Sequence, residues 1–220
     1  MDEPVWDGIT RVETLTAAGA ASRHALADRA KEYDWVAVLA ALTEQPQLVN
    51  STRPGGQARY TVLHQAAHGD APRDVVEQLL ARGAWRTSRD ARGDRPVDIA
   101  RQLGHDALLP VLEPLLVHDV PLDTLQEMQR HFHAVIRERA EKLVREHALR
   151  RPELEPLLEL PTPRLWFAVP GMYGGFAFWL ERVGGSPVLI VESWNRVVEG
   201  SGQRHLISPH GQLLLEEGFV

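Results

Sequence analysis

Two apolar helical segments in the middle of the chain, repeated further along, constrain the fold more than any other feature. Residues 61–67 read TVLHQAA, and a second segment with helical apolar spacing follows at 75–84. Aligning 61–66 with 95–100 gives matching apolar positions at an offset of 34 residues. Recurrence at such a period is typical of folds that stack similar helix pairs. We therefore expect part of this chain to be a helical repeat stack.

The repeated segments resemble ankyrin repeats over residues 20–117. The offset is one residue longer than the ankyrin period of about 33. Residues 34–50 resemble the end of an earlier repeat, whose first helix would be 22–33. Pro110 and Pro114 interrupt the last predicted helix, 108–116, and favour a shortened terminal repeat.

Two histidines of the central repeat have different interpretations. His64 occupies the histidine position of the ankyrin motif, so the resemblance implies a structural side chain that hydrogen-bonds neighbouring repeats together. His68, beside Gly69, has no such explanation. It could line the concave face of the stack or cap its helix, and the cap is favoured.

The resemblance implies protein binding through the turn tips and the surface of the first helices. An arginine-rich stretch lies between the two repeats, with Asp90 and Asp94 interleaved. Arginine and tryptophan are enriched among interface hot spots, which makes this stretch a candidate partner-binding edge. The alternative is a solvated loop with local Arg/Asp pairing of little energetic value. The residues of the predicted edge are Trp85, Arg86, Arg89, Arg92 and Arg95.

Composition excludes several classes of protein. The net charge of −6 shows no basic excess of the kind that nucleic-acid binders carry. Without cysteine there is no disulfide, thiolate zinc site or cysteine nucleophile. No window approaches the ~18 apolar residues of a membrane span, and the first residues lack an apolar signal segment, so we expect a cytoplasmic protein. Arginine supplies 22 of the 24 basic residues, a bias typical of GC-rich bacterial genomes.

The pattern changes after the repeats. A long helix is predicted within 119–149, with apolar residues at helical spacing from Leu125 to Val144 and Asp123 as its N-cap. A short helix is predicted at 153–160. His131 and His133 are two residues apart, a spacing that does not share a helix face, so no metal site is expected there.

From residue 164 onward the sequence has strand-like alternation. Five segments separated by glycine and proline turns predict an antiparallel meander of four or five strands, covered by the 125–144 helix. The segments are 165–169, 176–182, 187–198, 204–208 and 212–217. This tail resembles those of uncharacterised bacterial ankyrin-repeat proteins, and the resemblance transfers no known activity to this chain. The predicted fold is α+β, with an ankyrin-like repeat domain and N-terminal cap at 1–117, and a linker helix plus β-meander module at 118–220.

The predicted sheet offers one candidate catalytic site. Strand alternation places Glu192, Trp194 and Arg196 on one face, and a turn near residue 200 would bring Arg196 opposite His205. Glu192 or His205 could act as a general acid or base, with Arg196 holding an anion. Cross-strand structural pairing is the alternative explanation. The candidate residues are Tyr173, Glu192, Arg196 and His205.

Two function classes remain. The sequence has no P-loop, dinucleotide fingerprint, nucleophile elbow, His-Glu-x-x-His motif or calcium loop, and no cofactor or metal is expected. The leading hypothesis is an adaptor or inhibitor that binds a protein partner, without nucleic acid or membrane. The alternative is a cofactor-independent isomerase or cyclase of bacterial metabolism, acting on a small carbonyl-containing molecule in the sheet module.

Overall fold

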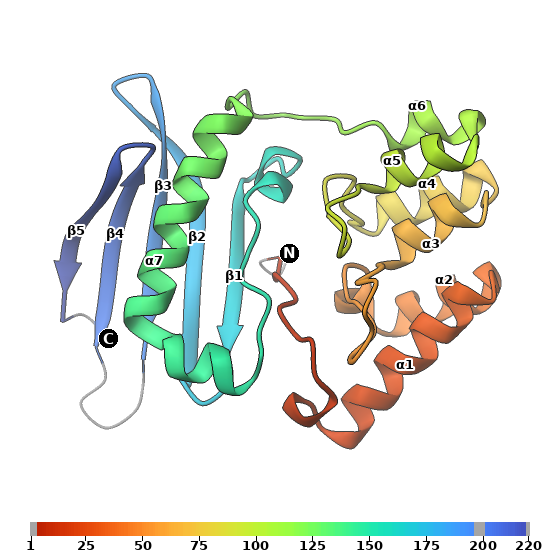
Figure 1. The fold of residues 1–220 in the computed structure, drawn as a ribbon, viewed down its shortest axis with the longest axis horizontal. Coiled ribbons are helices and arrows are strands. Elements are labelled where there is room, and N and C mark those ends of the chain that lie inside the picture. Colours follow the sequence, from red (N-terminus) through yellow and green to blue (C-terminus); the bar gives the residue numbers. More distant parts are fainter. Residues whose placement is uncertain (1–3, 196–200, 219–220) are drawn as a thin grey trace. The chain divides into compact units, whose positions relative to one another are not determined.

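The computed structural model describes residues 4–195 and 201–218. The chain divides into two compact units (Figure 1). The helical unit comprises Ile9–Leu115, and the sheet unit comprises Leu116–Val220 together with Met1–Gly8. Each unit is described separately below.

The helical unit contains three consecutive pairs of helices. Thr16 begins the first helix by accepting the Gly19 amide at 3.1 Å, and Asp34 begins the second by accepting the Ala37 amide at 3.1 Å. Such side-chain caps satisfy amides that lack a partner within the helix. The helices are α1 (Ala17–Lys31), α2 (Trp35–Glu44), α3 (Val62–His68), α4 (Arg73–Ala81), α5 (Pro96–Leu103) and α6 (Leu109–Leu112).

The helix pairs pack side by side in chain order. The first helices form one row, in which α3 contacts both α1 and α5, and the second helices form another, in which α4 contacts α2 and α6. Apolar side chains between the rows are almost fully buried, including Val38, Leu63 and Leu79. The predicted helix 108–116 is reduced to α6 and a 3-10 turn (Asp106–Leu108), because a proline lacks the amide that would extend it.

His64 ties the middle helix pair to the next loop. The ring is fully buried, and Nδ1 lies 2.8 Å from the Thr61 hydroxyl and 3.2 Å from the Thr61 amide nitrogen. Its Nε2 faces the carbonyl oxygen of Asp94 at 3.4 Å. A buried polar ring needs such partners, so His64 has the structural role expected from the sequence.

The sheet unit is an antiparallel meander, as predicted. Its strand order is β1-β2-β3-β4-β5, so each strand pairs with its neighbours in sequence. The strands are β1 (Arg164–Val169), β2 (Gly174–Val183), β3 (Ser186–Trp194), β4 (Gly202–Ser208) and β5 (Gly211–Glu217).

One long helix, α7 (Leu122–Glu146), lies across one face of this sheet (Figure 1). The Phe132 ring is fully buried, with its centroid 4.8 Å from that of Phe178 and 6.3 Å from that of Phe176. The predicted covering helix is thereby confirmed. We call the face toward α7 the inner face and the opposite one the outer face.

Two helix predictions in this unit need correction. The N-cap of α7 is Pro121, not Asp123, whose carboxylate instead accepts the amide of Thr124 at 2.6 Å. The predicted helix 153–160 is a single 3-10 turn, Glu155–Leu158. Pro156 fixes the start of this turn, and the next proline, Pro161, follows too soon for a longer helix.

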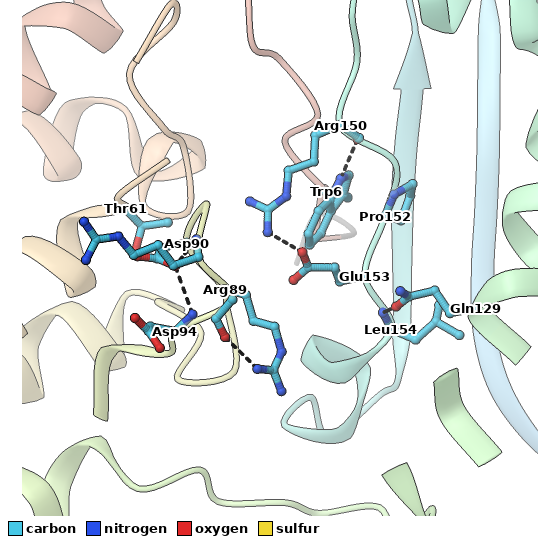
Figure 2. Close-up of polar contacts among 12 residues, drawn as sticks. Trp6, Thr61, Arg89, Asp90, Asp94, Gln129, Arg150, Pro152, Glu153 and Leu154 are labelled. Carbon is cyan, nitrogen blue, oxygen red and sulfur yellow. Dashed lines mark hydrogen bonds and ion pairs between the residues drawn. The ribbon is translucent and has the colours of Figure 1, made fainter. Parts of the chain in front are cut away.

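The first residues extend the sheet unit beyond β1. The Trp6 amide donates to the Trp166 carbonyl at 2.8 Å, and the Trp166 amide donates to the Pro4 carbonyl at 3.0 Å. The Trp6 indole donates to the Arg150 carbonyl at 3.1 Å, and Arg150 pairs with Glu153 at 2.5 Å (Figure 2). Residues 4–8 therefore belong with the sheet, whereas the sequence pattern predicted that they belong with the repeats. Among the described residues, no helix is long and apolar enough to cross a bilayer.

Candidate functional site

The predicted sheet site does not assemble around Glu192. Glu192 pairs across the sheet with Arg204, whose Nε lies 2.7 Å from Glu192 Oε1. His205 instead pairs with Val191, the neighbour of Glu192 in β3. Successive residues of a strand point to opposite faces, so Glu192 lies on the outer face and His205 on the inner face. An acid–base pair of these two side chains is therefore absent.

His205 is buried beneath α7. Its side chain is 5% exposed, and its Nδ1 has no hydrogen-bond partner in the described part of the chain. Burial lowers the pKa of His205, with Arg139 acting in the same direction and Glu138 and Glu217 opposing. Arg139 donates from Nε to the Ser193 hydroxyl at 3.2 Å and from Nη1 to the Ser201 hydroxyl at 3.1 Å, which fastens α7 to the sheet.

The two other predicted site residues do not complete a cavity. Tyr173 has a left-handed φ of 50° in the turn before β2, and its side chain is 74% exposed. Arg196 lies outside the described residues. The described sheet residues thus offer a cross-strand ion pair and a buried histidine.

Most residues of the predicted partner-binding edge are buried or form hydrogen bonds within the helical unit. Trp85 is 5% exposed and its amide donates to Asn50 Oδ1 at 3.0 Å. Arg86 Nε donates to the Val111 carbonyl at 2.9 Å, and Arg89 Nη1 donates to the Gly93 carbonyl at 2.7 Å.

The last two residues of the edge differ from each other. The amide of Arg95 donates to Asp98 Oδ2 at 3.0 Å at the start of α5, whereas the side chain of Arg92 is exposed at the loop tip. The five residues therefore do not form one free surface, and Arg92 is the member that lines a hollow.

Asp90 holds this loop in shape. Asp90 is 6% exposed, and one carboxylate oxygen accepts the amide of Arg92 at 2.7 Å and that of Asp94 at 2.9 Å. Figure 2 shows the contact between Asp90 and Asp94. The Ala91 amide donates to the Ala58 carbonyl at 2.9 Å, which joins this loop to the preceding one. Hydrogen bonds to a buried carboxylate are strong, so the loop presents a fixed surface.

Beside these loops the helical unit is hollowed along one side. A first hollow of about 490 Å³ lies between α1, the loop 51–61 and α3. A second hollow of about 510 Å³ lies between the loop 57–60, the loop 90–94 and α5. The two share Gln57, Ala58, Tyr60 and His68, so they adjoin each other along the row of first helices, and we call them together the groove.

Aromatic side chains occupy the middle of the groove. The Tyr33 hydroxyl lies 2.9 Å from His68 Nδ1, and the Tyr60 and His68 rings are tilted with centroids 6.2 Å apart. Partial burial raises the pKa of Tyr60, and Asp90 adds to this effect. Tyr33 has a left-handed φ of 59°, which is uncommon for a bulky residue and often marks a functional site. His68 thus lines the groove, whereas the sequence favoured a helix cap.

The groove is unevenly charged. Arg23, Lys31, Arg53 and Arg59 line the first hollow, and no acidic residue is among its described lining. The second hollow carries Arg92 together with Asp90 and Asp94. Nowhere in residues 4–195 and 201–218 does a group of three His, Cys, Asp or Glu side chains suit a metal ion.

Comparison with known proteins adds little to this picture. No family model matches the chain. The chain is similar to squamosa promoter-binding-like protein 6 of Oryza sativa subsp. japonica, with 39% identity over 64 residues. That match covers 26% of the chain and 7% of the plant protein, so the chain spans only a small fraction of this relative. A match of this extent identifies no family.

Proposed function

We propose that the helical unit is a protein-interaction module that binds an extended segment of a partner protein in the groove. The observation that carries this proposal is that the two hollows adjoin at Gln57, Ala58, Tyr60 and His68. Each hollow is in the range of about 300–1,000 Å³ that accommodates ligand groups, and together they suit a chain rather than a compact small molecule.

The resemblance to ankyrin repeats supports the same side of the unit. In that interpretation the pairs α1/α2, α3/α4 and α5/α6 are successive repeats, and partners bind at the turn tips and first helices. The groove is lined by these elements, namely α1, α3, α5 and the loops 51–61 and 90–94. The arginine-rich loop contributes through Arg92 rather than through Trp85, Arg86 or Arg89.

The groove walls are suited to recognition because they are held in place. Asp90 closes one loop, the Ala91 amide links it to the preceding loop, and Asn50 Nδ2 donates to the Gly83 carbonyl at 2.8 Å. A surface that is ordered before binding loses less conformational entropy when the partner docks. Tyr33, 41% exposed, offers an aromatic contact of the kind enriched at hot spots.

A variant in which a large side chain blocks the groove tests the proposal directly. Peptides would be selected from a random display library on the full chain, and their affinities measured by fluorescence anisotropy for two variants. Ala27→Trp fills the first hollow from α1, whereas Ala25→Trp places the same side chain on an exposed position of the same helix that does not line the groove.

We expect Ala27→Trp to weaken binding by about tenfold or more, equivalent to about 1.4 kcal/mol, and Ala25→Trp to leave it unchanged. Circular dichroism would show that both variants keep their helices. Equal affinity of the two variants for every selected peptide would overturn the groove as the binding site.

A further inference from the structure

We infer that the segment bound in the groove is acidic, with its carboxylate side chains in the first hollow. This inference rests on the proposed function and specifies the partner's chemistry. It follows from the sign and placement of the charges in the groove, in a chain whose net charge is −6.

The first hollow has a surplus of positive charge. Arg53 is neutralised in part by its ion pair with Asp28. Lys31 and Arg59 are both exposed, and neither side chain has a hydrogen bond or ion pair to another described residue. Lys31 is the last residue of α1, and Arg59 has a left-handed φ of 55° in the facing loop. Two cations that have no partner among the described residues, one on α1 and one in the loop, thus line the same hollow and can bind a carboxylate there.

Polar groups beside these cations can complete the recognition. The Tyr33 and Tyr60 hydroxyls and the Gln65 amide line the same hollow. Each can donate a hydrogen bond to a carboxylate or to a peptide carbonyl. The rings of the two tyrosines also supply apolar surface for the methylene groups of a Glu side chain.

The charge pattern gives the bound segment a direction. Asp90 and Asp94 accompany Arg92 in the second hollow, so the surplus of positive charge ends there. Carboxylates of the ligand are therefore expected beside α1, and neutral or basic residues beside the loop 90–94. A uniform polyanion such as nucleic acid would meet Asp94 and the negative charge of the whole chain, which disfavours it.

The probe is a fluorescein-labelled peptide enriched from the display library, tested beside a copy in which each Asp and Glu is replaced by Asn and Gln. We expect the acidic peptide to bind the full chain about tenfold more tightly than its amide copy, with the difference shrinking as salt screens the charges.

Charge reversal in the groove supplies the matched test. The double variant Lys31→Glu plus Arg59→Glu should bind the acidic peptide about tenfold or more less tightly, and its affinity for the amide copy should stay unchanged. Lys142→Glu reverses the other lysine of the chain, on α7 in the sheet unit, and should have no effect.

The outcomes separate the inference from the proposed function. If peptides bind in the groove but the amide copy binds as tightly as the acidic peptide, the acidic preference is wrong and the proposed function stands. If no peptide binds, or if Ala27→Trp leaves binding intact, the proposed function fails. Competition by inorganic phosphate or a single-stranded oligonucleotide at the affinity of the acidic peptide would overturn the peptide as the ligand.

Discussion

The hydroxyl of Tyr33 lies 2.9 Å from Nδ1 of His68, so this contact links the turn after α1 to the last residue of α3. The Tyr33 ring also sits directly over Gly69, where a Cβ atom would lie 2.2 Å from Tyr33 Cε1. The absence of a side chain at residue 69 therefore determines where this ring can lie.

Gly69→Ala should displace the Tyr33 ring and destabilise the helical unit by about 1–3 kcal/mol, the usual penalty of an overpacked site. Urea denaturation of the full chain measures the change. In a Tyr33→Ala background the same substitution should have little effect, because the clash partner is gone. An equal loss in both backgrounds would show that the ring is not the obstacle.

Asp90→Ala should destabilise the chain by about 2–3 kcal/mol, because two amides lose a charged acceptor in a buried loop. Asp90→Asn retains an oxygen acceptor and should lose less. Equilibrium unfolding in urea gives both values. Similar small losses for the two variants would show that the carboxylate does not organise the loop.

Stability should fall as the pH drops below the ordinary histidine pKa of 6.5, because burial lowers the pKa of both His133 and His205 in the folded state. The unfolded chain then binds more protons than the folded one, so protonation favours unfolding between 6.5 and the lower folded values. Arg151 and Arg137 lower the pKa of His133 further, and its hydrogen bond to the Pro152 carbonyl opposes them.

Unfolding free energies at about pH 7.5 and pH 5.5 test this linkage. The variant His133→Gln plus His205→Gln should show a smaller difference between the two conditions than the unaltered chain. The same difference in both proteins would assign the acid sensitivity to other groups.

Phe132→Ala should destabilise the sheet unit by about 3–5 kcal/mol, since it removes a fully buried ring from the contact between α7 and the sheet. Leu122→Ala, at an exposed position of the same helix, is the matched control. Thermal unfolding followed by circular dichroism compares them, and equal midpoints would contradict the assigned core.

Much of the fold follows from the sequence because its periodicities are long and uninterrupted. Apolar residues at helical spacing located α7, and five alternating segments between turns located the strands within a few residues. The helix ends were less predictable. Asp123 could have capped α7, but Pro121 already supplies the backbone conformation and lacks an amide that would need a partner.

The strand register predicted for the sheet site was wrong. It required Arg196 opposite His205, but Val191 occupies that position, a shift of five residues along β3. An odd shift reverses the face of every side chain, so Glu192 meets Arg204 instead of the histidine. The predicted turn was centred on Gly200 and Ser201, yet Gly202 already belongs to β4.

The ankyrin-like motif indicated the side of the first helices but not the residues that line the groove. Tyr33, Arg59 and Tyr60 lie at a helix end or in a loop without periodicity, and tertiary packing alone brings them to one hollow. The left-handed backbone at Tyr33 and Arg59 is a structural signal with no marker in the sequence, because neither residue is a glycine.

The most direct test of the groove uses the fact that the chain contains two lysines, Lys31 in the first hollow and Lys142 on α7. Acylation with an amine-reactive ester, read by mass spectrometry with and without a saturating acidic peptide, reports on both at once. Binding in the groove predicts that the peptide protects Lys31 and leaves Lys142 fully reactive. Unchanged acylation of Lys31 in the bound complex, or protection of Lys142 instead, would contradict the account.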